Sequence, residues 1–263
     1  MAFASTILEI RDLRLEIAGQ RICTSLSLQL QAGECLGVLG QNGTGKTTLL
    51  HTLARLRPAQ GGEILLRGQS LNAWSRKALA RQLGVLFQSS TDSMPASVEE
   101  TALMGRHPHL PDWQWESADD VAVARTALKA VNLDSLLTRD INTLSGGERQ
   151  RLALAMLLAQ KPQLYLLDEP GNHLDIAFQV KSLQLLREQL AQQNAALCMA
   201  THDINLAARF CDRILLLRGD GEPLIGATRD VLTPETLSHA YGCSIGVVNA
   251  GSRQVFYLSL IHI

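Results

Sequence analysis

The sequence has few aromatic residues and almost no net charge. Phe, Trp and Tyr make up 4% of its 263 residues, and 24 Lys and Arg against 25 Asp and Glu leave a formal net charge of −1. Domains that bind nucleic acid are usually markedly basic, so this balance argues against a nucleic-acid partner. The length and the apolar fraction of 46% indicate a globular chain with a sizeable core.

Long apolar runs are also missing. The longest, such as residues 152–159, fall well short of the roughly 18–20 residues that a membrane-spanning helix needs. The N-terminus has no basic region followed by a long apolar stretch, so we expect no secretory signal. The sequence therefore predicts a chain that does not cross a bilayer by itself.

Cysteines are few, and their spacing carries no motif. There are five, an odd number without a CxxC pair, and four of them sit in apolar or mixed stretches. We expect small buried side chains in a reducing compartment rather than metal ligands or disulfides.

Periodic patterns predict how the chain is organised. Alternating or short apolar runs predict strands, and a 3.6-residue period predicts helices. Strands that alternate with helices favour a parallel sheet covered on both faces. The expected strands are 7–17, 25–30, 35–40, 61–68, 83–88, 163–170, 195–203 and 212–222, and the expected helices are 47–56, 116–133, 176–193 and 204–210.

Helical periodicity between about residues 97 and 160 interrupts this alternation. We expect a single domain over 1–263, with a core formed by 1–92 and 161–222, an inserted helical subdomain over 93–160 and a C-terminal extension over 223–263. Within the helical part, residues 106–117 hold two Pro, two His and two Trp and are expected to form a loop.

The strongest motif is GQNGTGKT, residues 40–47, which matches G-x-x-x-x-G-K-[ST] between a predicted strand and a predicted helix. Its glycines allow backbone N–H groups to surround phosphate oxygens, and the following helix directs its positive end at the same anion. Lys46 is expected to reach the outer phosphates and Thr47 to hold Mg²⁺. The flanking elements disfavour the alternative, a glycine-rich turn that happens to contain a lysine.

A second motif is LYLLDEP, residues 164–170, an apolar strand that ends in two carboxylates. Ligands of α/β proteins bind at this edge of the sheet. We expect Asp168 to position Mg²⁺ through its water shell and Glu169 to polarise the attacking water as a general base.

A third motif, LSGGERQR at residues 144–151, begins a predicted helix. A hydroxyl and two glycines before a helix form another anion site. Together the three motifs resemble the ATP-binding subunit of ABC transporters, over nearly the whole chain. The resemblance implies an α/β fold of the P-loop NTPase (RecA-like) type, with a parallel core sheet, an antiparallel β region and an inserted helical subdomain.

The resemblance also assigns roles to single residues. Gln88 matches the glutamine that contacts Mg²⁺ and water, and His202 matches the histidine that contacts the γ-phosphate; without the family, both would be ordinary polar residues at strand ends. The implied site has four parts: the catalytic residues Glu169, His202, Gln88 and Lys46; the ATP-binding residues Gly40, Gln41, Asn42, Gly43, Thr44, Gly45, Lys46, Thr47, Thr48 and Ile17; the Mg²⁺ ligands Thr47, Gln88 and Asp168; and Ser145, Gly146, Gly147, Glu148 and Asp175, which act in trans on the ATP of a second subunit.

Two positions depart from the family pattern. Ile17 stands near the place where the family often stacks an aromatic residue on adenine, so base selectivity for ATP is left open. Gly171 stands where Thr or Ser is usual after the acidic pair, which is expected to loosen that loop without removing a catalytic group.

The resemblance implies an ATPase that uses ATP and Mg²⁺ and works as a homodimer with two membrane-spanning permease subunits, and indirectly with a solute-binding protein. It would sit as a peripheral subunit on the cytoplasmic face of the inner membrane. Residues 97–110 and 226–245 resemble importers of siderophore-iron, haem and cobalamin. The alternatives are an ABC system for another solute, a separate-chain exporter and a soluble non-transport ABC protein.

Three smaller features have no assigned function. His107 and His109 are expected to be solvent-exposed loop residues, because two histidines alone cannot complete a metal coordination shell. Trp113 and Trp115 either contact a partner or pack the loop. Residues 259–263 have no clear role in the sequence.

Overall fold

A six-stranded sheet forms the centre of the computed structural model, which describes residues 5–87, 95–111, 113–172, 174–251 and 253–259. Its strand order is β10-β9-β3-β8-β7-β6, and all neighbours run parallel except β10 and β9. The predicted α/β fold with a parallel core sheet is thereby confirmed. The strands are β3 (Cys35–Gly40), β6 (Leu83–Leu86), β7 (Leu164–Asp168), β8 (Ala196–Ala200), β9 (Arg213–Leu217) and β10 (Leu224–Ala227).

A second, antiparallel sheet has the order β2-β1-β4-β5. It contains β1 (Thr6–Ile17), β2 (Gln20–Gln31), β4 (Gly61–Leu66) and β5 (Gln69–Ser70). β2 starts earlier than predicted because Ala18 and Gly19, with φ of 50° and 82°, form a two-residue turn that pairs Ile17 with Gln20. Alternating buried residues of β1 and β2 then cover one face of the core.

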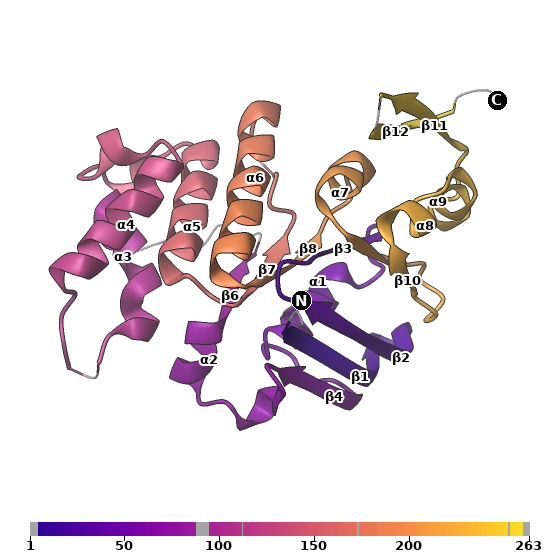
Figure 1. Ribbon diagram of the computed structural model, residues 1–263, viewed down its shortest axis with the longest axis horizontal. Coiled ribbons are helices and arrows are strands. Elements are labelled where there is room, and N and C mark those ends of the chain that lie inside the picture. The colour runs from indigo at the N-terminus through magenta and orange to yellow at the C-terminus, as the bar shows by residue number, and fades with distance from the viewer. Residues whose placement is uncertain (1–4, 88–94, 112, 173, 252, 260–263) are drawn as a thin grey trace.

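α1, α6 and α7 pack on the six-stranded sheet (Figure 1). α6 (Ile176–Gln193) and α7 (Ile204–Phe210) begin and end at the predicted residues, whereas α1 (Lys46–Leu53) ends before the predicted Leu56. α1 buries Leu49, Leu50 and Leu53 in the cluster that also holds β1 and β2. α6 and α7 belong to the cluster on the other face, so both faces of the sheet are covered.

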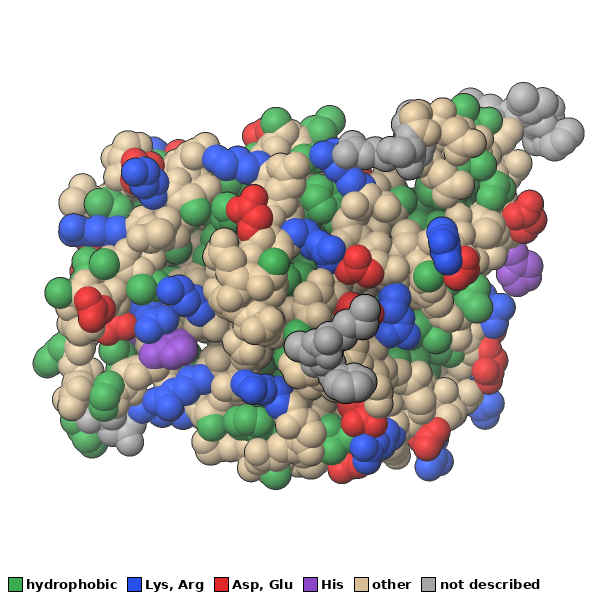
Figure 2. All heavy atoms as spheres, viewed as in Figure 1, with side chains coloured by type: hydrophobic (Ala, Val, Ile, Leu, Met, Phe, Trp, Pro, Cys, Tyr) green, Lys and Arg blue, Asp and Glu red, His purple; other side chains and the backbone are tan. Residues whose placement is uncertain are grey.

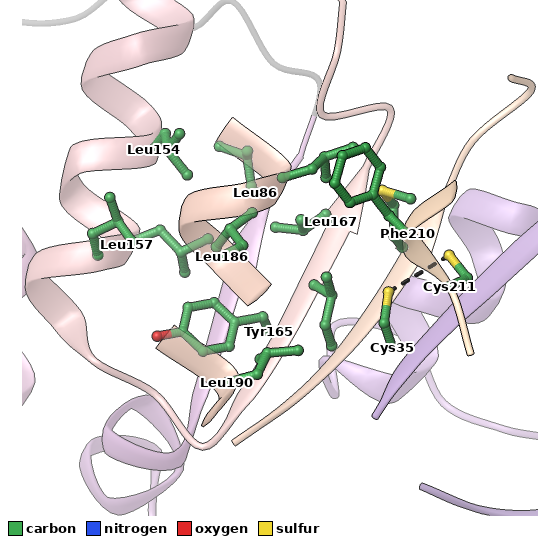
Figure 3. Packing of buried hydrophobic residues seen from close by; sticks show 14 of the residues in the cluster. Cys35, Leu86, Leu154, Leu157, Tyr165, Leu167, Leu186, Leu190, Phe210 and Cys211 are labelled. Atoms are coloured by element: carbon green, nitrogen blue, oxygen red, sulfur yellow. Dashed lines mark hydrogen bonds between the residues drawn. The ribbon is translucent and has the colours of Figure 1, made fainter. Parts of the chain in front are cut away.

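The core on the α6 side joins elements from distant parts of the sequence. It contains Leu154 and Leu157 of α5 (Gly146–Gln160), Leu186 and Leu190 of α6, and Tyr165 of β7 (Figure 3). Four of the five cysteines are buried as expected, and the sulfurs of Cys35 and Cys211 lie 3.5 Å apart; Cys243 is exposed.

Most of the described residues between β6 and β7 are helical, as predicted, and α3, α4 and α5 lie together at one end of the molecule (Figure 1). One expectation was wrong: the start of the predicted loop 106–117 is a 3₁₀ helix. Arg106 fixes this helix, because its side chain donates to Asp120 at 2.9 Å and to the Ala159 carbonyl at 2.9 Å. The elements of this region are α3 (Val98–Leu103), η2 (Met104–His109), α4 (Ala118–Ala130), η3 (Asp134–Leu136), η4 (Ile141–Thr143) and α5 (Gly146–Gln160), whereas η1 (Leu71–Ala73) and α2 (Arg76–Gln82) precede β6.

The C-terminal extension, for which the sequence predicted no elements, is ordered into a unit of its own. It comprises α8 (Thr228–Val231), α9 (Pro234–Tyr241), β11 (Ile245–Ala250) and β12 (Arg253–Leu258). Leu237, Ile245 and Phe256 bury this C-terminal unit against the same core as α7. Of residues 259–263, only Ser259 lies within the described part of the chain.

Charged side chains of both signs are interspersed over the face shown in Figure 2, in keeping with the balanced composition. Among the residues that the structure describes, no helix is both long enough and apolar enough to cross a membrane.

Candidate functional site

The glycine-rich loop joins the end of β3 to the start of α1. Gly45 caps α1 in a left-handed conformation (φ 98°), so the helix begins directly at Lys46. The ammonium group of Lys46 donates hydrogen bonds to the carbonyls of Gly40 (2.8 Å) and Gln41 (3.0 Å). Burial lowers the pKa of Lys46, and the carboxylates of Glu169 and Asp168 act against that shift. The loop therefore holds a buried cation at the N-terminus of a helix.

Asp168 and Thr47 meet although 121 residues separate them. The Thr47 hydroxyl donates to Oδ2 of Asp168 at 2.6 Å, and the Asp168 residue is only 5% exposed. β7 ends beside β8 in the sheet and close to the start of α1. This arrangement places the Asp168 carboxylate next to Thr47. The pair combines a hydroxyl and a carboxylate oxygen, which are the hard ligands that Mg²⁺ prefers.

Glu169 leaves β7 with a positive φ of 50°, and its backbone N–H bonds the Ala200 carbonyl at the end of β8. Its Oε2 lies 2.8 Å from Nδ1 of His202, which follows β8. The Glu169 side chain is 14% exposed and that of His202 is 64% exposed. Two parallel strands thus deliver a carboxylate and an imidazole to the same point, as an acid–base pair requires.

Lys46, Thr47, Asp168 and Glu169 line an open pocket of about 330 Å³. Ile17, at the end of β1, forms part of the pocket wall. The antiparallel sheet therefore contributes an apolar side chain at the place where the sequence predicts the adenine ring of ATP. The structure brings together Ile17, Asn42, Gly43, Gly45, Lys46, Thr47, Thr48, Asp168 and Glu169 as lining residues.

The third motif lies apart from this lining. Ser145 caps α5 and forms a capping box with Glu148, whose carboxylate accepts from the Ser145 backbone N–H at 2.7 Å. Asp175 caps α6 in the same way and accepts from the Phe178 N–H at 2.8 Å. None of Ser145, Glu148 and Asp175 lines the pocket as described, so these capped helix ends face a different part of the surface.

Other predicted features have mixed outcomes. Gln88, predicted as a catalytic residue and Mg²⁺ ligand, lies outside the described residues. The expectation of two exposed histidines was wrong for His109, whose Nε2 lies 2.7 Å from the Gln160 carbonyl in a half-buried position. Trp113 and Trp115 are almost fully exposed, so they do not pack the loop.

One residue close to the site carried no signal in the sequence. Tyr241, in the C-terminal unit, ends α9 next to the glycine-rich loop, and the Gln41 side chain donates to the neighbouring Ala240 carbonyl at 2.9 Å. These partners are 199 positions apart. No local pattern could have paired them, because the contact depends on how the C-terminal unit folds back.

Comparison with known proteins adds an independent line of information. A family model described as "ABC transporter" matches residues 23–172. A hemin import ATP-binding protein of Pseudomonas fluorescens is 42% identical, with 91% of this chain and 94% of that protein covered. A ferric enterobactin transport ATP-binding protein of Escherichia coli is 34% identical over 87% of this chain and 84% of that protein.

A cobalamin import ATP-binding protein of Halobacterium salinarum is 35% identical over 91% of this chain, which spans only 60% of that relative's length. Among solved structures, one described as an inward-facing metal-chelate type ABC transporter is 29% identical, with a TM-score of 0.82 and 97% of each chain covered. Family, relatives and fold therefore point in one direction.

Proposed function

The chain belongs to the ABC transporter family, and on that premise we propose that it is the ATP-binding and ATP-hydrolysing subunit of an importer for a metal chelate, such as siderophore-bound iron, haem or cobalamin. The observation that carries the proposal is the pocket in which Lys46, Asp168 and Glu169 converge. The named relatives supply the solute class.

The glycine-rich loop binds the triphosphate. Its backbone N–H groups and the N-terminus of α1 attract the anion, and Lys46 supplies a full positive charge from a buried position. Phosphate oxygens pair with this ammonium more strongly than the neutral carbonyls of Gly40 and Gln41 do. Lys46 thereby stabilises the charge that develops on the transferred phosphoryl group.

Mg²⁺ fits the residues present, because Thr47 and Asp168 offer two hard oxygens within 2.6 Å of each other. These two residues would hold the ion, together with Gln88 as the family resemblance implies. When bound, the ion neutralises charge on the phosphate oxygens.

Glu169 acts as the general base and accepts the proton of the attacking water. His202 lies 2.8 Å from its carboxylate and holds it at the open end of the pocket. Positioning of this kind supplies much of the rate acceleration in phosphoryl transfer.

The remaining motif residues act on a second subunit. Ser145, Gly146, Gly147, Glu148 and Asp175 do not line the pocket of their own chain. In the proposed homodimer, the exposed N-terminus of α5 closes the ATP bound to the partner, as helix N-termini do with anions. ATP then favours the closed dimer because it contacts both halves, and hydrolysis removes that contact.

The closing motion is passed to two membrane-spanning permease subunits at the cytoplasmic face of the inner membrane, where the chain is a peripheral subunit. In this scheme residues 1–92 and 161–222 hold the nucleotide, and the helical subdomain 93–160 and Gln88 transmit the motion.

Replacing the base tests the proposed function. Glu169→Gln keeps the size and polarity of the side chain but removes proton acceptance, so turnover should fall at least 100-fold. ATP binding, measured with a fluorescent nucleotide, should stay within about twofold of wild type, and ATP should trap a dimer in size-exclusion chromatography.

Glu188→Gln is the matched control, because Glu188 lies exposed on α6 and outside the pocket. It should hydrolyse ATP at the wild-type rate. A Glu169→Gln chain that did the same would show that Glu169 is not the base, and a wild-type chain without ATPase activity would overturn the proposed function itself.

A further inference from the structure

The C-terminal unit contacts the start of the glycine-rich loop. The Gln41 side chain does not line the pocket; its Nε2 donates to the Ala240 carbonyl at 2.9 Å. Ala240 lies in the last turn of α9, where helix carbonyls have no partner within the helix. The hydrogen bond therefore satisfies α9 and fixes one loop residue at the same time.

Tyr241, the next residue, reaches the same place. Its ring packs against the core and its hydroxyl oxygen is buried, without a hydrogen-bond partner among the described residues. Burial raises the pKa of Tyr241 to about 12, the Gly40 backbone acts against that shift, and the Glu169 carboxylate adds to it.

Several contacts hold α9 in place. Gly242 ends the helix in a left-handed conformation (φ 69°), and the backbone N–H of Ile245 donates to the Ser238 hydroxyl at 2.9 Å. On the far side, the amide of Asn205 in α7 bonds both the N–H (2.8 Å) and the carbonyl (3.1 Å) of Phe256 in β12.

Those contacts tie the C-terminal unit to the helix that follows His202. α7 begins after Asp203, directly behind the histidine that faces Glu169. The unit thus contacts the glycine-rich loop through α9, and its β12 contacts α7, the helix that follows His202.

We propose that Gln41 is a positioning residue of the nucleotide site, and that through its hydrogen bond to Ala240 the C-terminal unit holds the Gly40–Gln41 segment in the geometry that binds ATP. The proposal rests on the proposed function and deepens it. It assigns the Gln41 side chain to α9 rather than to the nucleotide. It also gives residues 228–258 a role in ATP binding, although they lie far from the motifs in the sequence.

Two conservative variants test it in the full chain. Gln41→Met keeps the length of the side chain and removes the donor. Tyr241→Phe is the adjacent comparison, since it removes a hydroxyl that has no hydrogen-bond partner among the described residues. Loss of one positioning hydrogen bond corresponds to about a fivefold effect. Gln41→Met should raise the Kd for a fluorescent ATP analogue and the KM for ATP by about fivefold, with kcat within twofold of wild type, whereas Tyr241→Phe should leave Kd and KM within twofold of wild type.

The double variant should bind ATP about as weakly as Gln41→Met alone, because the Tyr241 hydroxyl contributes no hydrogen bond of its own. Tyr257→Phe is the control, since Tyr257 lies half-exposed on β12; it should leave Kd, KM and kcat unchanged.

Melting temperature separates positioning from a general structural role. A chain that is merely less stable would lose active molecules, which lowers kcat and the melting temperature and leaves KM unchanged. Wild-type Kd and KM in Gln41→Met, or a loss confined to kcat and melting temperature, would overturn the proposal. If wild type itself neither bound nor hydrolysed ATP, the proposed function would fail instead.

Discussion

At the residue scale, two glycines of the same loop face different physical demands. Gly43 (φ 82°) has open space where a Cβ would be, whereas a Cβ on Gly45 (φ 98°) would lie 2.6 Å from the buried Ile22 side chain. Both positions are strained for an L-residue, but only Gly45 also has a neighbour in the way. The two substitutions therefore separate backbone strain from steric overlap.

We predict that Gly43→Ala lowers the free energy of unfolding by about 1–2 kcal/mol, the cost of a left-handed alanine. Gly45→Ala should lose a further 1–3 kcal/mol or so, because Ile22 is packed on all sides and must shift. Urea unfolding without nucleotide measures both. Equal losses at the two positions would show that the Ile22 contact costs nothing.

Site residues fall into two groups according to how far the sequence could predict them. Lys46, Thr47, Asp168 and Glu169 belong to short motifs at strand ends, and a parallel sheet necessarily brings such ends to one edge. Tyr241 belongs to no motif, because its place beside Gly40 depends on the packing of a distant unit.

At the element scale, α4 shows how one helix end can depend on pH. Asp120 accepts from the hydroxyl of Ser117 (2.7 Å) and from Arg106 (2.9 Å). These hydrogen bonds, that of Ser117 first, hold the pKa of Asp120 at about 2, below its ordinary 3.8. A lowered pKa in the folded chain means that the ionised carboxylate stabilises the fold above about pH 4 and loses that effect as the pH falls towards 2.

Asp120→Asn should therefore destabilise the chain by about 1–2 kcal/mol at pH 7, as expected for hydrogen bonds to a charged group. The difference from wild type should shrink between pH 4 and pH 3. Urea unfolding across this range measures it. Asp119→Asn is the control, since Asp119 is an exposed neighbour in the same first turn; a pH-independent loss in Asp120→Asn would contradict the argument.

The accuracy of the predicted elements follows how strongly each one is specified locally. β3, α6 and α7 have the predicted bounds because continuous apolar runs or a clear helical period define them. η2 was missed since its stability comes from Arg106 and its contacts with α4 and α5, not from its own sequence. The short elements α8 to β12 were missed for the same reason: they are held by burial against α7.

At the scale of the whole molecule, one chain carries two incomplete halves of the proposed site. The pocket around Lys46 has no contribution from Ser145, which instead caps α5 elsewhere on the surface. If a second copy supplies the missing half, a defect in Lys46 and a defect in Ser145 should complement each other only when they lie on different chains.

Mixing a Lys46→Ala chain with a Ser145→Arg chain tests this. Neither chain alone should occlude ATP, because every composite site in its homodimer lacks one half. At a 1:1 mixture about half of the dimers are mixed, and each mixed dimer holds one intact site, so occlusion should recover to about a quarter of wild type.

A single chain that carries both substitutions, mixed with wild type, provides the counterpart. Its mixed dimers pair Lys46→Ala with one wild-type Ser145 and Ser145→Arg with one wild-type Lys46, so neither of their two sites is intact. Only the wild-type homodimers in that mixture should occlude ATP. If ATP occlusion did not recover in the first mixture, Ser145 would not act on the ATP of a second copy. The same would follow if the mixed dimers of the second mixture occluded ATP.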